Sequence, residues 1–103
     1  MLRVVRMTSD SVTIQWYPPS SDGGAEITKY VILKKQMPLD IWEEVGRVNS
    51  HTNTFTIINL RPGKSHYFAV YAMNTMGKGD RIETTRPIIP KKVVRKYIVI
   101  NLQ

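Results

Sequence analysis

The sequence predicts an all-β sandwich. Apolar and polar residues alternate with a period of two in several segments, and turn-forming residues separate these segments at intervals of about ten residues. No segment shows helical periodicity. With 103 residues, 42% of them hydrophobic, the chain has the size and composition of one ordinary domain with a single core.

The first half of the chain predicts four strands. Residues 2–4 form the first expected strand, and residues 11–16 alternate cleanly between apolar and polar side chains. Residues 18–24 contain two prolines and two glycines, which cannot continue a strand and therefore predict a loop. Residues 27–35 and 42–45 follow as two strands separated by a proline-containing turn.

The second half predicts three more strands. Residues 54–57 alternate and are closed by a Leu-Arg-Pro-Gly turn. Residues 66–74 form a longer strand, which we expect to end at Gly77 and Gly79. Residues 82–84 are the last expected strand.

Several motifs at matching spacing resemble the fibronectin type III family, and especially the domains of giant muscle proteins. These motifs include Pro-Pro-x-x-Asp-Gly-Gly at 18–24, Ala-x-Asn-x-x-Gly-x-Gly at 72–79 and a closing Pro-Ile-Ile-Pro-Lys at 87–91. The resemblance covers residues 2–90 and implies a seven-stranded, immunoglobulin-like sandwich with Greek-key connections. Strands A, B and E would pack on strands C, C′, F and G.

The resemblance also implies a core and a structural corner. The expected core residues are Trp16, Tyr30, Ile32, Phe55, Ile57, Leu60, Phe68, Val70 and Ala72. His66 stands where the family has a tyrosine whose hydroxyl bonds back across a turn, so we expect His66 to make the corner hydrogen bond. Either the imidazole stays neutral and replaces the phenol, or its titration makes the corner sensitive to pH.

The outward side of the C, C′, F and G sheet is the expected protein-binding face. Alternation places a set of apolar side chains there, and related muscle domains often carry charges at such positions. The set comprises Val31, Leu33, Tyr67, Tyr71 and Met73. An apolar patch of this kind is typical of interface centres, whereas the alternative is scattered surface hydrophobic residues.

The expected domain organisation is a fibronectin type III domain at 1–90, followed by a basic, β-prone segment at 91–103. The chain has a formal net charge of +7, and five of its fifteen basic residues lie in the last eighteen positions. This segment is read as a linker or the start of a next element, with docking to a sheet edge or a lipid surface as alternatives.

Catalytic and cofactor chemistry find no support in the sequence. The chain has no cysteine and only two histidines, so neither a thiolate metal site nor a histidine cluster is expected. Glu43 and Glu44 are adjacent on a strand and therefore face opposite sides. We expect no cofactor, no metal and no nucleic-acid partner, because no stacking aromatic residues accompany the basic ones. No apolar run is long enough to span a bilayer, so a membrane role is not expected.

The resemblance implies a non-catalytic spacer and protein-interaction module of a large sarcomeric or cytoskeletal protein in the cytoplasm. The alternative is an extracellular adhesion or receptor domain, since Lys78-Gly79-Asp80 lies where fibronectin carries its integrin-binding tripeptide. The absence of cysteine and of an Asn-x-Ser/Thr triplet favours the cytoplasmic alternative.

Overall fold

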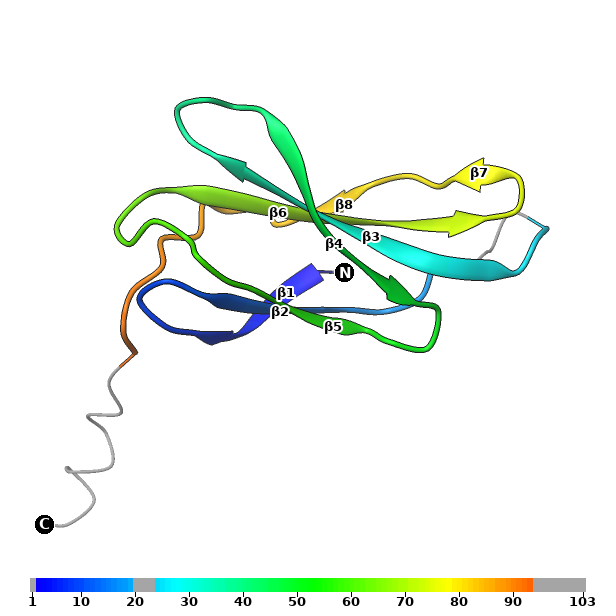
Figure 1. Ribbon diagram of the computed structural model, residues 1–103, viewed down its shortest axis with the longest axis horizontal. Coiled ribbons are helices and arrows are strands. Elements are labelled where there is room, and N and C mark those ends of the chain that lie inside the picture. Colours follow the sequence, from blue (N-terminus) through cyan, green and yellow to red (C-terminus); the bar gives the residue numbers. More distant parts are fainter. Residues whose placement is uncertain (1, 20–23, 94–103) are drawn as a thin grey trace, which may run out of the picture.

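The fold is a sandwich of two antiparallel sheets, as predicted (Figure 1). The computed structural model describes residues 2–19 and 24–93. Its strands are β1 (Leu2–Met7), β2 (Val12–Trp16), β3 (Ile27–Gln36), β4 (Trp42–Asn49), β5 (Thr54–Ile57), β6 (His66–Asn74), β7 (Gly77–Lys78) and β8 (Ile82–Glu83). The described residues contain no helix, and accordingly none that could cross a membrane.

The two sheets have the strand order that the resemblance implies. One sheet has the order β1-β2-β5, and the other has the order β4-β3-β6-β7, with β8 also paired to β6. They correspond to strands A, B and E facing strands C′, C, F and G. In Figure 1 the β1-β2-β5 sheet lies below the β4-β3-β6-β7 sheet, and the chain crosses from one sheet to the other several times.

The last strand differs from the prediction, because it is divided into β7 and β8. Gly77 was expected to end the preceding strand, but it begins β7 and pairs with Asn74. The chain reverses over the two residues between Asn74 and Gly77. Gly77 has a φ of 131°, a conformation that favours glycine. The backbone of Gly79 then donates a hydrogen bond to the Ala72 carbonyl at 2.8 Å. The two glycines therefore build the hairpin.

The core forms where the alternating strands of the two sheets face each other. Seven of the nine expected core residues are buried, whereas Phe55 and Ala72 are half-buried and pack against the others. The ring of Trp16 meets that of Tyr30 edge to face, with centroids 5.5 Å apart. Burying such an aromatic ring stabilises the folded state by about 2–3 kcal/mol, so this pair is a main contributor to the core.

Candidate functional site

The outer face is the side of the β4-β3-β6-β7 sheet that points away from the core. Strand register brings its members together across β3 and β6: Val31 lies opposite Tyr71, Leu33 opposite Ala69, and Lys35 opposite Tyr67. On the other side of β3, Trp42 lies opposite Lys35. The outer face thus begins as a row of apolar and aromatic side chains with a lysine at one end.

Aromatic rings and cations form a second layer over this row. The Lys35 ammonium lies 4.8 Å from the centroid of the Trp42 ring and 5.3 Å from that of Tyr67. The Arg81 guanidinium carbon also lies 4.8 Å from the Trp42 centroid. Trp42 belongs to β4, while Arg81 adjoins β8 on the far side of β6. A contact between these two residues must therefore cross over both β3 and β6.

The exposure of the five predicted side chains differs from the expectation at Val31. Val31 points outward but is fully buried, and Leu33, Tyr67, Tyr71 and Met73 are only partly exposed. Sequence alternation gave the direction of these side chains but missed what covers them. The one sequence signal for this cover was Trp42, an aromatic residue in a strand segment otherwise rich in charged residues. The outer face therefore presents aromatic rings with cations lying over them.

Two of the cations over the rings of the outer face are also paired with acids. The Lys35 ammonium lies 2.9 Å from the Asp40 carboxylate, and the Arg81 guanidinium lies 3.0 Å from that of Glu83. Such exposed pairs stabilise the fold by about 0–1 kcal/mol each, but they fix where the cations lie. The outer face can therefore recognise a partner through shape and aromatic contact more than through net charge.

His66 makes the corner contact with its backbone neighbourhood. Its Nδ1 lies 2.8 Å from the Lys64 carbonyl oxygen, which can only accept, so Nδ1 carries the proton. The imidazole is fully buried, stacks on Phe68, and leaves Nε2 without a partner among the described residues. Burial lowers the pKa of His66 below its usual 6.5, the nearby Lys34 charge lowers it further, and the Lys64 hydrogen bond opposes both effects. The geometry is that of a neutral imidazole.

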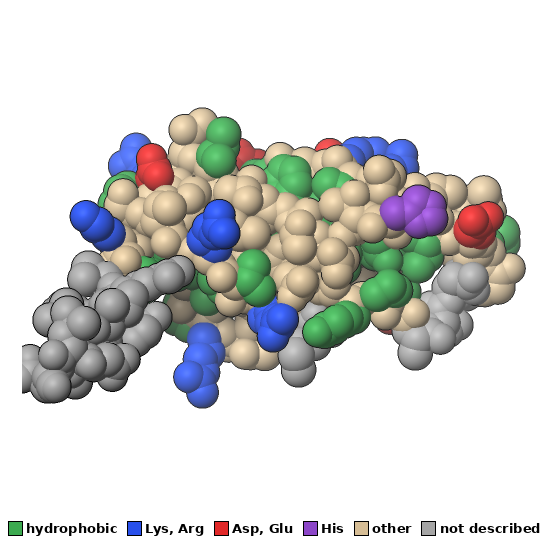
Figure 2. All heavy atoms as spheres, turned by 90° about the horizontal axis from the view of Figure 1, so that it is seen from below, with side chains coloured by type: hydrophobic (Ala, Val, Ile, Leu, Met, Phe, Trp, Pro, Cys, Tyr) green, Lys and Arg blue, Asp and Glu red, His purple; other side chains and the backbone are tan. Residues whose placement is uncertain are grey.

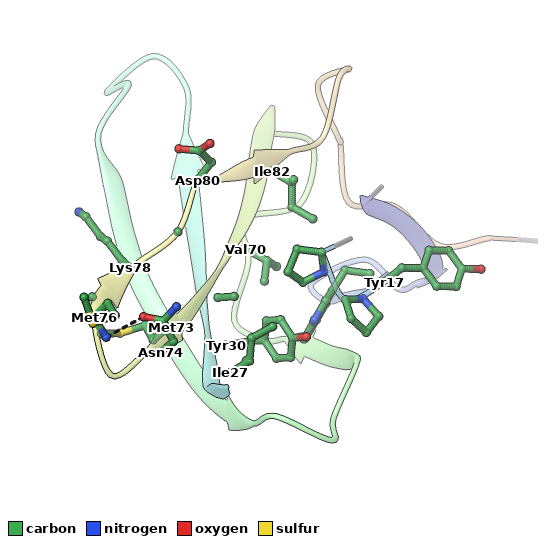
Figure 3. A pocket seen from close by; sticks show the side chains of 16 residues that line it. Tyr17, Ile27, Tyr30, Val70, Met73, Asn74, Met76, Lys78, Asp80 and Ile82 are labelled. Carbon is green, nitrogen blue, oxygen red and sulfur yellow. Dashed lines mark hydrogen bonds between the residues drawn. The ribbon is translucent and has the colours of Figure 1, made fainter. Parts of the chain in front are cut away.

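A groove of about 630 Å³ opens at the end of the sandwich where β2 and β6 finish. Figure 3 shows it between Tyr17, with the prolines that follow, and the β6–β7 hairpin. Tyr30, Ile27 and Val70 form its floor, while Met76 at the hairpin tip is 82% exposed. The groove is mainly apolar, and the sequence alone gave no sign of it because its walls come from distant segments.

Comparison with known proteins identifies the fold family. The model of the fibronectin type III domain matches residues 1–89. The chain belongs to this family. The fibronectin type III domain is 35% identical over 81 residues to the titin homolog of Caenorhabditis elegans and 29% identical over 91 residues to the titin of Drosophila melanogaster. These matches cover 79% and 88% of the chain.

Solved structures give the same result. The crystal structure of domains A168–A170 from titin superposes with a TM-score of 0.81 and 32% identity, covering 89% of this chain and 31% of that one. The twitchin kinase region from C. elegans gives a TM-score of 0.83 and 26% identity, covering 92% and 17%. The fibronectin type III domain spans less than a tenth of the length of the curated muscle relatives it matches.

The Lys78-Gly79-Asp80 tripeptide is not at the tip of a loop in this fibronectin type III domain. Lys78 ends β7, and its ammonium lies 5.6 Å from the centroid of the Tyr71 ring, whereas the turn itself is formed by Thr75 and Met76. An integrin-type ligand needs its basic and acidic side chains free at an exposed apex. The structure holds the lysine against the outer face instead.

Histidine and carboxylate side chains stay apart in the part of the chain that the structure describes. No three histidine or carboxylate side chains of residues 2–19 and 24–93 lie close enough to hold a metal ion. Glu43 pairs with Lys34 at 3.6 Å, whereas Glu44 pairs with Arg47 at 2.8 Å.

Proposed function

We propose that this fibronectin type III domain is a spacer and protein-interaction module of a larger protein of the sarcomere or cytoskeleton. One observation carries the proposal: the chain enters and leaves the domain at opposite ends. Leu2 pairs with Trp16 beside the groove, whereas the backbone of Gly63 donates a hydrogen bond to the Pro90 carbonyl at the other end. The nine residues of β6 run between these ends, a span of roughly 26 Å at about 3.3 Å per residue.

The relatives support this role. They include titins and myosin-binding protein C of the fast type from Mus musculus, which is 34% identical over 67 residues. A domain with opposite ends, placed in such a long chain, sets a fixed distance between its neighbours. We further propose that the domain occupies residues 1–90, that residues 91–103 are a linker or the start of the next element, and that the domain is non-catalytic and without a cofactor. Residues 94–103 lie outside the described residues.

A second candidate is an extracellular adhesion or receptor domain. The domain is also 30% identical over 86 residues to the neuronal cell adhesion molecule of Rattus norvegicus. Adhesion through the Lys78-Gly79-Asp80 tripeptide is disfavoured, because the Lys78 ammonium lies over the Tyr71 ring. Attachment of cells to the immobilised domain, lost on Asp80→Ala substitution, would favour this second candidate.

The spacer role is tested by placing spin labels at Arg3 and Lys91, at the two ends, and measuring the distance distribution between them. We expect one narrow distribution that is unchanged when the domain is flanked by its natural neighbours. A broad distribution, or one that shifts with the neighbours, would contradict a rigid spacer.

The docking role is tested on the outer face within the parent protein. Tyr71→Glu introduces a charge there, and Thr54→Glu, on the opposite sheet, is the matched control. Circular dichroism first establishes that both variants fold. We expect only the first substitution to weaken an interaction of the parent protein, and equal behaviour of the two variants would refute docking through this face.

A further inference from the structure

Basic side chains of the domain fall into two groups that differ in their surroundings. On the sheets, most bases meet an acid, an amide or a ring, as Arg3 does with Gln15 at 2.7 Å. At the end where the chain leaves the domain, the exposed bases make no ion pair with any described residue. We call this group the exit-end cluster; it comprises Arg61, Lys64, Arg86, Lys91 and Lys92.

Two segments hold the exit-end cluster in place. The turn at 61–64 and the segment 86–92 lie side by side, joined by the hydrogen bond from Gly63 to Pro90 and by a reciprocal pair between His66 and Ile88 at 2.8 Å each. Pro90 is fully buried and anchors the second segment. The first three bases of the cluster, and the two lysines that follow Pro90, therefore project from fixed backbone.

Acids near this end do not neutralise the cluster. The β3–β4 turn lies at the same end, since the Met37 amide donates to the Ser65 carbonyl at 2.9 Å. Asp40 of this turn pairs with Lys35, and Glu43 at the start of β4 pairs with Lys34. Asp10 is also at this end, where its carbonyl accepts the Leu60 amide, and its carboxylate accepts a hydrogen bond from the Thr8 hydroxyl. Five unpaired positive charges against one acid leave a local excess.

We propose that the exit-end cluster is a docking surface for an acidic protein surface. The inference rests on the proposed interaction function and names its partner chemistry. Charge complementarity selects an acidic partner and raises the rate of encounter. Ile89, 44% exposed between Ile88 and Pro90, provides the apolar contact within a basic rim that protein interfaces favour. Figure 2 shows the outward side of the β1-β2-β5 sheet, where Lys and Arg side chains stand out singly among apolar and polar ones.

The other anionic partners fit the exit end less well. Binding of single-stranded nucleic acid relies on aromatic side chains that stack on bases, and the cluster contains none. Attachment to an anionic bilayer is strengthened by a broad apolar face that inserts below the headgroups, whereas Ile89 is a single apolar side chain among the bases. Single-stranded nucleic acid and an anionic bilayer are therefore tested as alternative partners.

The experiment compares two triple variants of the 103-residue chain with equal loss of charge. The first is Arg61→Ser, Lys64→Ser and Arg86→Ser. The control is Arg6→Ser, Lys29→Ser and Lys78→Ser, which removes bases from the sheets. Binding is measured by titration with an aspartate- and glutamate-rich peptide, with vesicles containing phosphatidylserine, and with a single-stranded oligonucleotide.

We expect the peptide to bind the unmodified chain, with the first variant weakening its affinity about tenfold and the control less than threefold. Equal loss in both variants would show that net charge alone is responsible and would overturn the proposal. Tighter binding to vesicles or to the oligonucleotide than to the peptide would also overturn it. A failure of the peptide titration would not change the expected spin-label distance or the expected effect of Tyr71→Glu. Failure of this proposal can therefore be distinguished from failure of the proposed function.

Discussion

Gly46 is the position where one added methyl group tests the packing of the sandwich most directly. It lies on β4, and a Cβ atom built there would stand 2.4 Å from Cζ and 2.7 Å from Cε1 of the Phe55 ring on β5. Ordinary carbon contacts lie near 3.5–4.0 Å, so the ring would have to move by about 1 Å or more. Gly46 has no positive φ, so alanine is not strained by the backbone.

The two contributions to a Gly46→Ala change have opposite signs. Without the clash, replacing glycine by alanine in an unstrained position stabilises a protein by about 0.4–1 kcal/mol. Overpacking against Phe55 costs about 1–3 kcal/mol. We therefore expect a net loss of about 1–2 kcal/mol in the free energy of unfolding. Urea unfolding followed by tryptophan fluorescence measures this loss, and we expect the denaturant slope to be unchanged.

Two variants decide whether Phe55 is the cause. Gly79→Ala is the matched control, because its Cβ would lie 3.5 Å from the Ala72 carbonyl oxygen, an ordinary contact. Phe55→Leu shortens the side chain that clashes, so it should cost less in the Gly46→Ala background than in the unmodified chain, with a coupling of about 0.5–3 kcal/mol. A Gly46→Ala protein as stable as the unmodified one, or additive effects in the double variant, would refute the reasoning.

Three further predictions follow from the described contacts. Because the pKa of His66 is lowered in the folded state, the unfolded chain binds more protons as pH falls below 6.5, so the free energy of unfolding should fall by up to about 1.4 kcal/mol per pH unit. His66→Tyr should remove this decline and His51→Asn should keep it, whereas parallel pH profiles would contradict it. Thr84→Val should cost about 1–2 kcal/mol in urea unfolding, because the hydroxyl accepts the buried Phe68 amide at 3.1 Å; an unchanged midpoint would contradict this. Trp42→Ala should cost about 1–3 kcal/mol and expose the outer face to a hydrophobic dye, and no gain in dye binding would contradict the second layer.

The sheet order was implied by the resemblance to the fibronectin type III family, whereas the strand pattern could be predicted from local alternation. Val31 shows where this reasoning stops. Its outward direction follows from a period of two, but its complete burial depends on side chains of the neighbouring strands, where it lies opposite Arg47 on β4 and Tyr71 on β6. Alternation describes one strand at a time, so it cannot report a layer built by residues from two others.

The hairpin and the groove illustrate the same limit. Gly77 and Gly79 were correctly recognised as special backbone positions, yet glycine is compatible with both the end of a strand and a tight reversal. The groove depends on how far the β6–β7 hairpin stands from Tyr17, a distance between segments more than fifty residues apart in sequence. Turn residues indicate that the chain bends, whereas the tertiary contacts decide what the bend lies beside.

The two ends of the domain differ in chemistry, and this difference bears on how such modules connect. The entry end carries an apolar groove with Asp80 at its margin, whereas the exit end carries the exit-end cluster around Ile89. Surfaces that differ in this way favour a heterologous contact, in which one end meets a different surface on its neighbour. A basic exit end also disfavours direct contact with a second basic exit end, because like charges brought together repel. A second basic exit end is therefore a poor partner for the exit-end cluster, whereas the acidic protein surface proposed above would complement it.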